Sequence, residues 1–350
     1  MVPAAEPHVT CAGMGDVPPL RIGARTSPLA RAQAELIAGL LAAHGVESTF
    51  VGVTTTGDVD RRQLTVIGGT GVFVGAVREA LWAGTIDVAV HSLKDLPTAA
   101  ADGLEMAAIP TREDTRDVLI GQRLSTLVDG MTIGTGAPRR ALQLQDYAHR
   151  TGLELNVVPI RGNVDTRLGL VRSGQLDAVV LAAAGLSRLG HLDVAEFDNQ
   201  AVSVAGLVGE VLSAEVMLPA PGQGALGLEI SSALPAALAD TIRVLDDPVA
   251  RAESLTERGF LAALEAGCTA PVGARAVVKS VRGTSLDLTL VAVIGRTLLS
   301  NLSEPTKVGP PLRVELHGST TDPVQFGADA AGHVLRELQD TQRSRLQGRG

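Results

Sequence analysis

The chain contains one motif twice, and this repeat constrains its fold more than any other feature. GTIDVAV at residues 84–90 returns as GQLDAVV at residues 174–180, ninety positions later. Each copy follows an amphipathic helical pattern, over residues 72–82 and 164–171, and each runs into a polar turn. Helices that alternate with buried strands form largely parallel sheets. The repeat therefore predicts two similar α/β lobes that face each other across a cleft.

The rest of the sequence completes this plan and adds a third unit. Ser27 and Pro28 are typical of the N-cap and first residue of a helix, which Gly45 ends. LPAPGQGALGLEI, residues 218–230, is expected to cross between the lobes and finish as a short strand. Beyond it, helical segments give way to three strand patterns and a last helix from about residue 325 to 342, which predicts a small α+β domain. The expected divisions are a flexible extension at 1–19, a first lobe at 20–114 with 214–232, a second lobe at 115–213 and a third domain at 233–350.

Charge and composition exclude several functional classes. The net charge of −8 argues against a general affinity for nucleic acid or anionic membranes, and an aromatic content of 2% argues against stacking on single-stranded bases. No apolar stretch approaches the roughly 18–20 residues that a membrane span needs. Cys11 and Cys268 lie too far apart to indicate a disulfide framework, and the first residues lack a signal-peptide pattern. We therefore expect a cytoplasmic protein without membrane or nucleic-acid partners.

Nucleotide and metal motifs are not supported. GQGALG at residues 222–227 has the spacing of a dinucleotide-binding fingerprint, but proline precedes it where a strand is needed, and LEI follows where a helix should start. The chain has no P-loop, and its seven histidines are scattered without metal-ligand spacing. We expect no metal.

HSLKDLPT, residues 91–98, places polar groups where an apolar strand opens into a turn. Lys94 and Asp95 form either a solvated turn or a charge pair that faces the cleft. In the second case Asp95 has the chemistry to stabilise a developing cation and to transfer a proton, while Lys94 tunes it.

Arginines gather between residues 139 and 188, where seven of them face four acidic residues. Arg139 and Arg140 follow GTGAP at an expected helix N-terminus, where free N–H groups favour an anion. Arg161 and Arg167 flank a Gly-Asn turn, and one of them is expected to face the cleft. The stretch predicts a site for a carboxylate or phosphate ligand. Arg25 and Ser27 of the first lobe are expected to face the same cleft, whereas Arg150 and Arg172 are typical of solvated helix faces.

Cys268 stands on a Gly-Cys turn between an expected helix and strand. Three interpretations are open for it: an inert core cysteine, an attachment point for a covalent group, and a nucleophile.

Taken together, these segments resemble one family, hydroxymethylbilane synthase, also called porphobilinogen deaminase. The resemblance implies an α/β fold with two similar periplasmic-binding-protein-like (type II) lobes around a cleft and a small C-terminal α+β domain. It covers most of residues 20–276 and is carried by RIGARTSPLARAQAE, TTTGD, GVFVGAVREAL, DVAVHSLKDLPT, GTGAPRRALQL, RGNVDTRL, AAAGLSRLG, LPAPGQGALGLE and ERGFLAALEAGCTAPVGA.

The resemblance also implies an activity. Such a transferase condenses four porphobilinogen molecules head to tail with loss of ammonia, then releases the linear tetrapyrrole hydroxymethylbilane by hydrolysis. It implies a monomer with a dipyrromethane cofactor joined by a thioether to Cys268, and Asp95 as the catalytic carboxylate. The acetate and propionate groups of the pyrroles would be bound by Arg25, Ser27, Lys94, Arg139, Arg140, Arg161, Asn163, Arg167, Arg188 and Gln223.

The sequence departs from the family pattern at Thr70 and Gly75, where lysines are common nearby, and at Ala137, where serine is common. Two other classes share some of the features. A bilobal solute-binding protein for a small carboxylate would have the same lobes, but it would not need Cys268 or a third domain. A cysteine hydrolase would need a base near Cys268, which only a distant residue such as His91 could supply.

Overall fold

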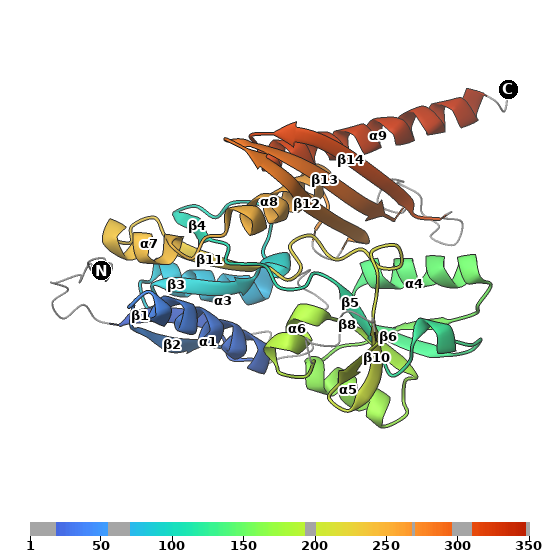
Figure 1. Cartoon of the computed structure of the whole chain (residues 1–350), viewed down its shortest axis with the longest axis horizontal. Helices are drawn as coiled ribbons and strands as arrows, with labels where there is room; N and C mark the ends of the chain where they lie inside the picture. The colour runs from blue at the N-terminus through green and yellow to red at the C-terminus, as the bar shows by residue number, and fades with distance from the viewer. Residues whose placement is uncertain (1–18, 55–70, 193–200, 268–269, 296–309, 348–350) are drawn as a thin grey trace, which may run out of the picture.

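Two α/β lobes lie side by side below a smaller sheet-and-helix domain (Figure 1). The computed structural model describes residues 19–54, 71–192, 201–267, 270–295 and 310–347, with backbone alone at 71–73 and 337–347. The loop region with Thr70, the cysteines Cys11 and Cys268, and the expected extension up to residue 18 lie outside the described residues.

The first lobe is a five-stranded sheet in the order β2-β1-β3-β11-β4. β1, β2 and β3 are parallel, while β11 runs antiparallel to both of its neighbours. Its core is formed by strand residues such as Ile22 together with Ile37 and Leu41 from the buried side of the first helix. The elements are β1 (Leu20–Arg25), α1 (Pro28–Ala43), β2 (Ser48–Val53), α3 (Gly71–Trp82), β3 (Val88–Ser92), β4 (Leu104–Ala108) and β11 (Leu226–Ser231).

The second lobe has the order β7-β6-β8-β5-β10-β9, whose first five strands repeat the plan of the first lobe. Here β5 is the antiparallel strand beside β8, as β11 is beside β3. In each lobe this strand follows the chain's passage through the other lobe, so the chain crosses twice between them. The elements are β5 (Asp117–Ile120), β6 (Thr132–Thr135), α4 (Pro138–Thr151), β7 (Asn156–Pro159), α5 (Val164–Arg172), β8 (Ala178–Ala182), α6 (Ala183–Arg188), β9 (Ala201–Val204) and β10 (Leu207–Val211).

The repeated motif has the same structural role in both lobes. Asp87 accepts a hydrogen bond from the main-chain N–H of Arg21 at 2.8 Å, and Asp177 accepts one from that of Thr132 at 2.7 Å. In both cases the N–H of the aspartate donates back to the carbonyl of the same residue. Each aspartate thus joins the start of one central strand to its parallel neighbour. The two similar lobes and their shared strand order confirm the expected fold class.

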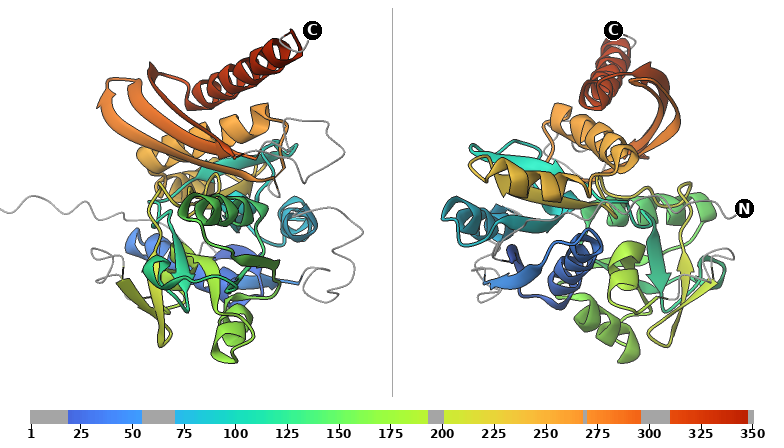
Figure 2. Two further views of the ribbon diagram at one scale, coloured as in Figure 1. Left: turned by 90° about the vertical axis from the view of Figure 1, so that its right-hand side faces the viewer. Right: turned by 60° about the vertical axis from the view of Figure 1, so that its left-hand side comes forward.

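The third unit is an antiparallel sheet covered on one face by two helices, as Figure 2 shows. Gly259 and Gly327 let the two helices approach closely: a Cβ on Gly327 would lie 2.0 Å from the carbonyl oxygen of Thr256. Phe260 is buried between the helices and the sheet. The elements are α8 (Pro248–Ala263), β12 (Val272–Arg282), β13 (Ser285–Ile294), β14 (Leu312–Thr320) and α9 (Pro323–Gln347), which match the three strands and last helix expected from the sequence.

Helix α7 (Ala236–Arg243) packs differently from the sequence-based division. Its residues Ala239 and Ile242 are buried in the core of the first lobe, although the expected third domain began at 233. The sequence could not show this, because an amphipathic helix does not reveal which sheet its apolar face covers. On this packing we place the start of the third domain at α8.

A buried ion pair fastens the third domain to both crossings between the lobes. Arg112, from the first crossing, donates to both carboxylate oxygens of Glu257 on α8, at 2.9 and 2.8 Å. Glu257 is fully buried, and it also accepts the main-chain N–H groups of Gly222, in the second crossing, and of Ala276 on β12. One carboxylate therefore links α8, the sheet beside it and both connections between the lobes.

Candidate active site

Two neighbouring cavities lie at the cleft, one of about 360 Å³ and one of about 220 Å³. The larger is lined by both lobes, by the second crossing and by residues of the third domain. The smaller lies against the first lobe. Leu29, Gln33, Ser92 and Asp95 line both cavities. Asp95 therefore stands where the two cavities meet.

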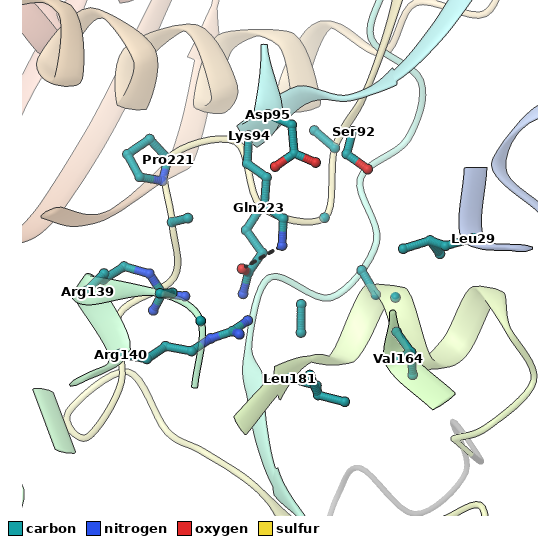
Figure 3. A pocket seen from close by; sticks show the side chains of 18 of the residues that line it. Leu29, Ser92, Lys94, Asp95, Arg139, Arg140, Val164, Leu181, Pro221 and Gln223 are labelled. Carbon is teal, nitrogen blue, oxygen red and sulfur yellow. Dashed lines mark hydrogen bonds between the residues drawn. The ribbon is translucent and has the colours of Figure 1, made fainter. Parts of the chain in front are cut away.

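Asp95 is positioned by the end of β3. The strand stops at Ser92 and the chain turns through the short 3₁₀ helix Leu93–Asp95, with the Leu93 side chain fully buried. Ser92 accepts a hydrogen bond from the Gln33 amide of α1 at 2.9 Å, which ties the turn to the first helix. Asp95 itself is exposed, and Figure 3 shows its carboxylate beside Lys94 above the cavity. Lys94 and Asp95 both line the larger cavity, so the turn faces the cleft, and the ammonium of Lys94 is bonded to Gln223.

On the opposite side of the cavity, two arginines share one buried aspartate. Arg139 lies 2.8 Å from one carboxylate oxygen of Asp117, and Arg140 lies 2.7 Å from the other. Asp117 is fully buried, and the arginines are 3% and 5% exposed. Burial raises the pKa of Asp117, but the two positive charges and their hydrogen bonds outweigh it and hold that pKa well below its usual range. The cluster keeps a net charge of +1 at the cavity wall.

Gln223 joins this cluster to the turn that carries Lys94 and Asp95. Its amide donates to Asp117 at 2.9 Å and to the carbonyl of Thr115 at 2.7 Å. Its side-chain oxygen accepts a hydrogen bond from Lys94 Nζ at 3.3 Å, the dashed line in Figure 3. Burial lowers the pKa of Lys94 to about 8, with the charge of Asp95 opposing the shift and that of Arg140 adding to it. Lys94 is therefore a cation that can lose its proton close to neutral pH.

Two further arginines reach the larger cavity with unsatisfied groups. The buried Nε atoms of Arg167 and Arg188 have no hydrogen-bond partner among the described residues. Arg188 donates one terminal N–H to the carbonyl of Gly224 at 2.7 Å, across the lobes. Burial lowers the pKa of both side chains, and the charge of Arg140 lowers that of Arg167 further. A carboxylate in the cavity would relieve both penalties, because it supplies acceptors and negative charge.

Of the remaining predicted residues, some line a cavity and others do not. Arg25 and Ser27 line the smaller cavity, where Ser27 is the N-cap of α1 as expected. Arg161 is exposed and lines neither cavity. Asn163 is also exposed and outside both, and its side chain caps α5 by accepting the N–H of Thr166 at 2.8 Å. Of the two arginines that flank the Gly-Asn turn, Arg167 is the one that faces the cleft.

The positions around Cys268 and the family departures are only partly described. Gly267 and Ala270, the nearest described residues on either side of Cys268, line the larger cavity. Ala137 lines it too and precedes α4 without a side-chain cap. Gly75 lies within α3, the helix that forms a wall of the smaller cavity.

Asp117 is the main residue that sequence reasoning missed. The signal was present: it opens the apolar strand DVLI, where an acidic residue needs a partner. A second missed cluster lies beside the smaller cavity, where Glu229 accepts two hydrogen bonds from Arg78 and lies 3.2 Å from His91. Burial raises the pKa of Glu229, but hydrogen bonds from His91 and Arg78 lower it more, to about 2.

Fold and site together define a bilobal α/β protein of the type II class, with a third domain and a cleft that combines a cluster of cations with an exposed acid. Comparison with known proteins gives the family. Residues 20–238 match the model "Porphobilinogen deaminase, dipyromethane cofactor binding domain", and residues 252–334 match "Porphobilinogen deaminase, C-terminal domain". The chain belongs to the porphobilinogen deaminase family.

Individual relatives agree. Porphobilinogen deaminase 1 of Streptomyces coelicolor is 50% identical over 298 residues, which cover 83% of this chain and 88% of that protein. Porphobilinogen deaminase of Cutibacterium acnes is 43% identical over 331 residues, 90% of this chain and 94% of that one. A solved periplasmic substrate-binding protein from Coxiella burnetii is 14% identical, with a TM-score of 0.38 over 66% of this chain and 94% of that one.

Family membership makes the chain an enzyme of the transferase class, with a domain for the dipyrromethane cofactor. The solute-binding alternative is not favoured. Among the described helices, none is long and apolar enough to cross a membrane.

Proposed function

We propose that the protein is a hydroxymethylbilane synthase, which joins four porphobilinogen molecules with loss of ammonia and releases the linear tetrapyrrole hydroxymethylbilane. The observation that carries this proposal is the place of Asp95, an exposed carboxylate where two cavities meet beside a cluster of cations. A pyrrole with acetate and propionate groups needs both parts: cations for its carboxylates and an acid near its ring.

The described cations fit a cofactor and substrate that bear several carboxylates. Arg167 and Arg188 have unsatisfied N–H groups at the larger cavity, and the Asp117 cluster keeps a net positive charge there. We propose that Arg139, Arg140, Lys94 and Gln223 complete this binding surface and that Arg25 and Ser27 serve the smaller cavity. Arg161 and Asn163, which line neither cavity, stay predictions.

Asp95 does the chemistry in this proposal. Ammonia leaves an aminomethyl carbon only if the positive charge that develops on the pyrrole is stabilised, and a nearby carboxylate does so while it accepts the pyrrole N–H. The same carboxylate can take up the proton that is lost when the new carbon–carbon bond forms. Lys94, protonated below about pH 8, holds a substrate carboxylate beside it.

The cofactor, attached in our proposal to the thiol of Cys268, supplies the pyrrole carbon that is extended. Gly267 and Ala270 line the larger cavity, which supports attachment at its wall. We further propose a monomer that works in the cytoplasm, consistent with its net charge of −8. Light scattering on a size-exclusion column tests the monomer.

The first experiment is an intact mass of the purified protein, followed by peptide mapping. We expect two linked pyrroles on the Cys268 peptide and turnover of added porphobilinogen. An unmodified protein that gains no adduct from porphobilinogen would refute the proposal.

Variants then test the roles of the residues. Asp95→Asn should keep the adduct and retain only a small residual turnover. Arg167→Gln should raise KM. Arg172→Gln is its control, because Arg172 lies on the same helix, is exposed and donates to the carbonyl of Ala205 outside both cavities. Equal KM values for the two variants would remove Arg167 from the binding surface.

A further inference from the structure

One arginine of the third domain holds the turn that carries Asp95. Arg258, on α8, donates to the main-chain carbonyls of Leu93 at 3.2 Å and Leu96 at 3.0 Å through one terminal nitrogen. Its other terminal nitrogen donates to the carbonyl of Pro97 at 2.6 Å. The three carbonyls bracket Asp95 in the sequence, one before it and two after it.

Other contacts also hold the turn, since the side chains of Leu93 and Leu96 are both buried in one apolar cluster. Within it, the N–H of Leu96 donates to the carbonyl of Leu93 at 3.2 Å, the single closing bond of a 3₁₀ turn. Leu93 is anchored by its buried side chain and by its N–H, which donates to the carbonyl of Ala225. Arg258 adds a charged contact that spans the turn from Leu93 to Pro97.

The guanidinium suits this task because its N–H groups have a fixed, planar geometry. The side chain is half-buried; burial lowers the pKa of Arg258, and the charge of Glu229 opposes that shift. Three charge-assisted bonds from one rigid group fix the direction of the turn and with it the Asp95 side chain.

We propose that Arg258 is a positioning residue, through which the third domain sets the place of the Asp95 carboxylate. The inference rests on the proposed function, since it assigns Asp95 the chemical role. Helix α8 ends at Ala263, five residues before Cys268. The same helix therefore holds the turn that carries the acid and ends, in the sequence, shortly before the cysteine that the proposed function assigns to the cofactor.

The test compares Arg258→Gln with Arg251→Gln. Arg251 is a matched control: it lies two turns earlier on α8 and also donates to first-lobe carbonyls, those of Met106 and Ala107, away from the turn. In preparations whose Cys268 adduct has the same mass as in the wild type, we expect Arg258→Gln to lower kcat at least tenfold with KM changed less than twofold. Arg251→Gln should stay within twofold of the wild type in both. Arg258→Lys, which keeps a charged donor, should recover part of kcat.

A double variant shows whether Arg258 acts through Asp95. In the Asp95→Asn background, Arg258→Gln should cost no further activity, whereas an unrelated role in stability would add its own loss. Hydrogen exchange at the amide of Leu96 should be faster in Arg258→Gln than in Arg251→Gln.

The outcomes separate this inference from the proposed function. If the wild type turns over porphobilinogen and Arg258→Gln retains kcat, or loses it together with Arg251→Gln, the inference fails and the proposed function stands. If the wild type neither carries the adduct nor turns over porphobilinogen, the proposed function fails and the role of Arg258 falls with it.

Discussion

Replacing Asp117 by asparagine tests the cluster at the cavity wall. Asp117 is fully buried between Arg139 and Arg140, with contacts of 2.8 and 2.7 Å. Asparagine has the same shape but no charge, and its NH₂ group would face the N–H groups of one arginine. Breaking a buried ion pair by removing one partner costs about 3–5 kcal/mol, because it leaves charge buried without compensation. At about 2–4 °C per kcal/mol, the Tm of the second lobe should fall by about 10 °C.

The control is Asp165→Asn on α5, in the same lobe. Asp165 pairs with His191 at 2.9 Å, and the Asp165 side chain is 57% exposed. Such a pair is worth about 0.2–1 kcal/mol, so its loss should move Tm by no more than about 4 °C. Scanning calorimetry of both variants measures the difference. A Tm for Asp117→Asn within about 2 °C of the control would refute the reasoning that the buried charge holds the arginines in place.

Three further predictions follow from features of the cleft and its supports. Because burial lowers the pKa of Lys94 to about 8, wild-type KM should rise between pH 7 and 9 as the ammonium loses its proton, while Lys94→Gln should show a flat KM over that window; parallel profiles would contradict this. Glu257→Gln deprives Arg112 of its bidentate partner, so calorimetry should show unfolding of the third domain at a temperature lower by at least about 6 °C. An unchanged unfolding temperature would show that the carboxylate does not link the domains. Gly224→Ala should be far more destabilising than Gly152→Ala, since both glycines have positive φ but only a Cβ on Gly224 would lie 2.4 Å from a main-chain oxygen; equal urea midpoints would show that the chain yields there without cost.

The sequence predicted the scaffold well because its signals are local. Ser27 and Pro28 mark a helix start through their own side chains, and the repeated aspartates mark strand starts ninety positions apart. The turn with Lys94 and Asp95 was placed at the end of a buried strand for the same reason.

Contacts between side chains that lie far apart in the sequence were harder to predict. Arg139 and Arg140 were expected at a helix N-terminus with charges free for an anion, yet they already share Asp117, which lies on another strand. Only the sheet order β6-β8-β5 brings that carboxylate beneath α4. Similarly, Arg258 stands next to Glu257 in the sequence, but the two side chains serve different partners because successive helical residues point in different directions.

The repeat also shows how the two sides of the cleft differ. The two copies of the repeat are ninety positions apart. Continued past the two strands, this spacing aligns Lys94 with Ala184 and Asp95 with Gly185. All four residues line the larger cavity. The first copy of the repeat thus presents charged groups to this cavity after its strand, and the second presents small residues that leave it open. A larger side chain at position 185 would reduce the volume of the cavity that Asp95 also lines.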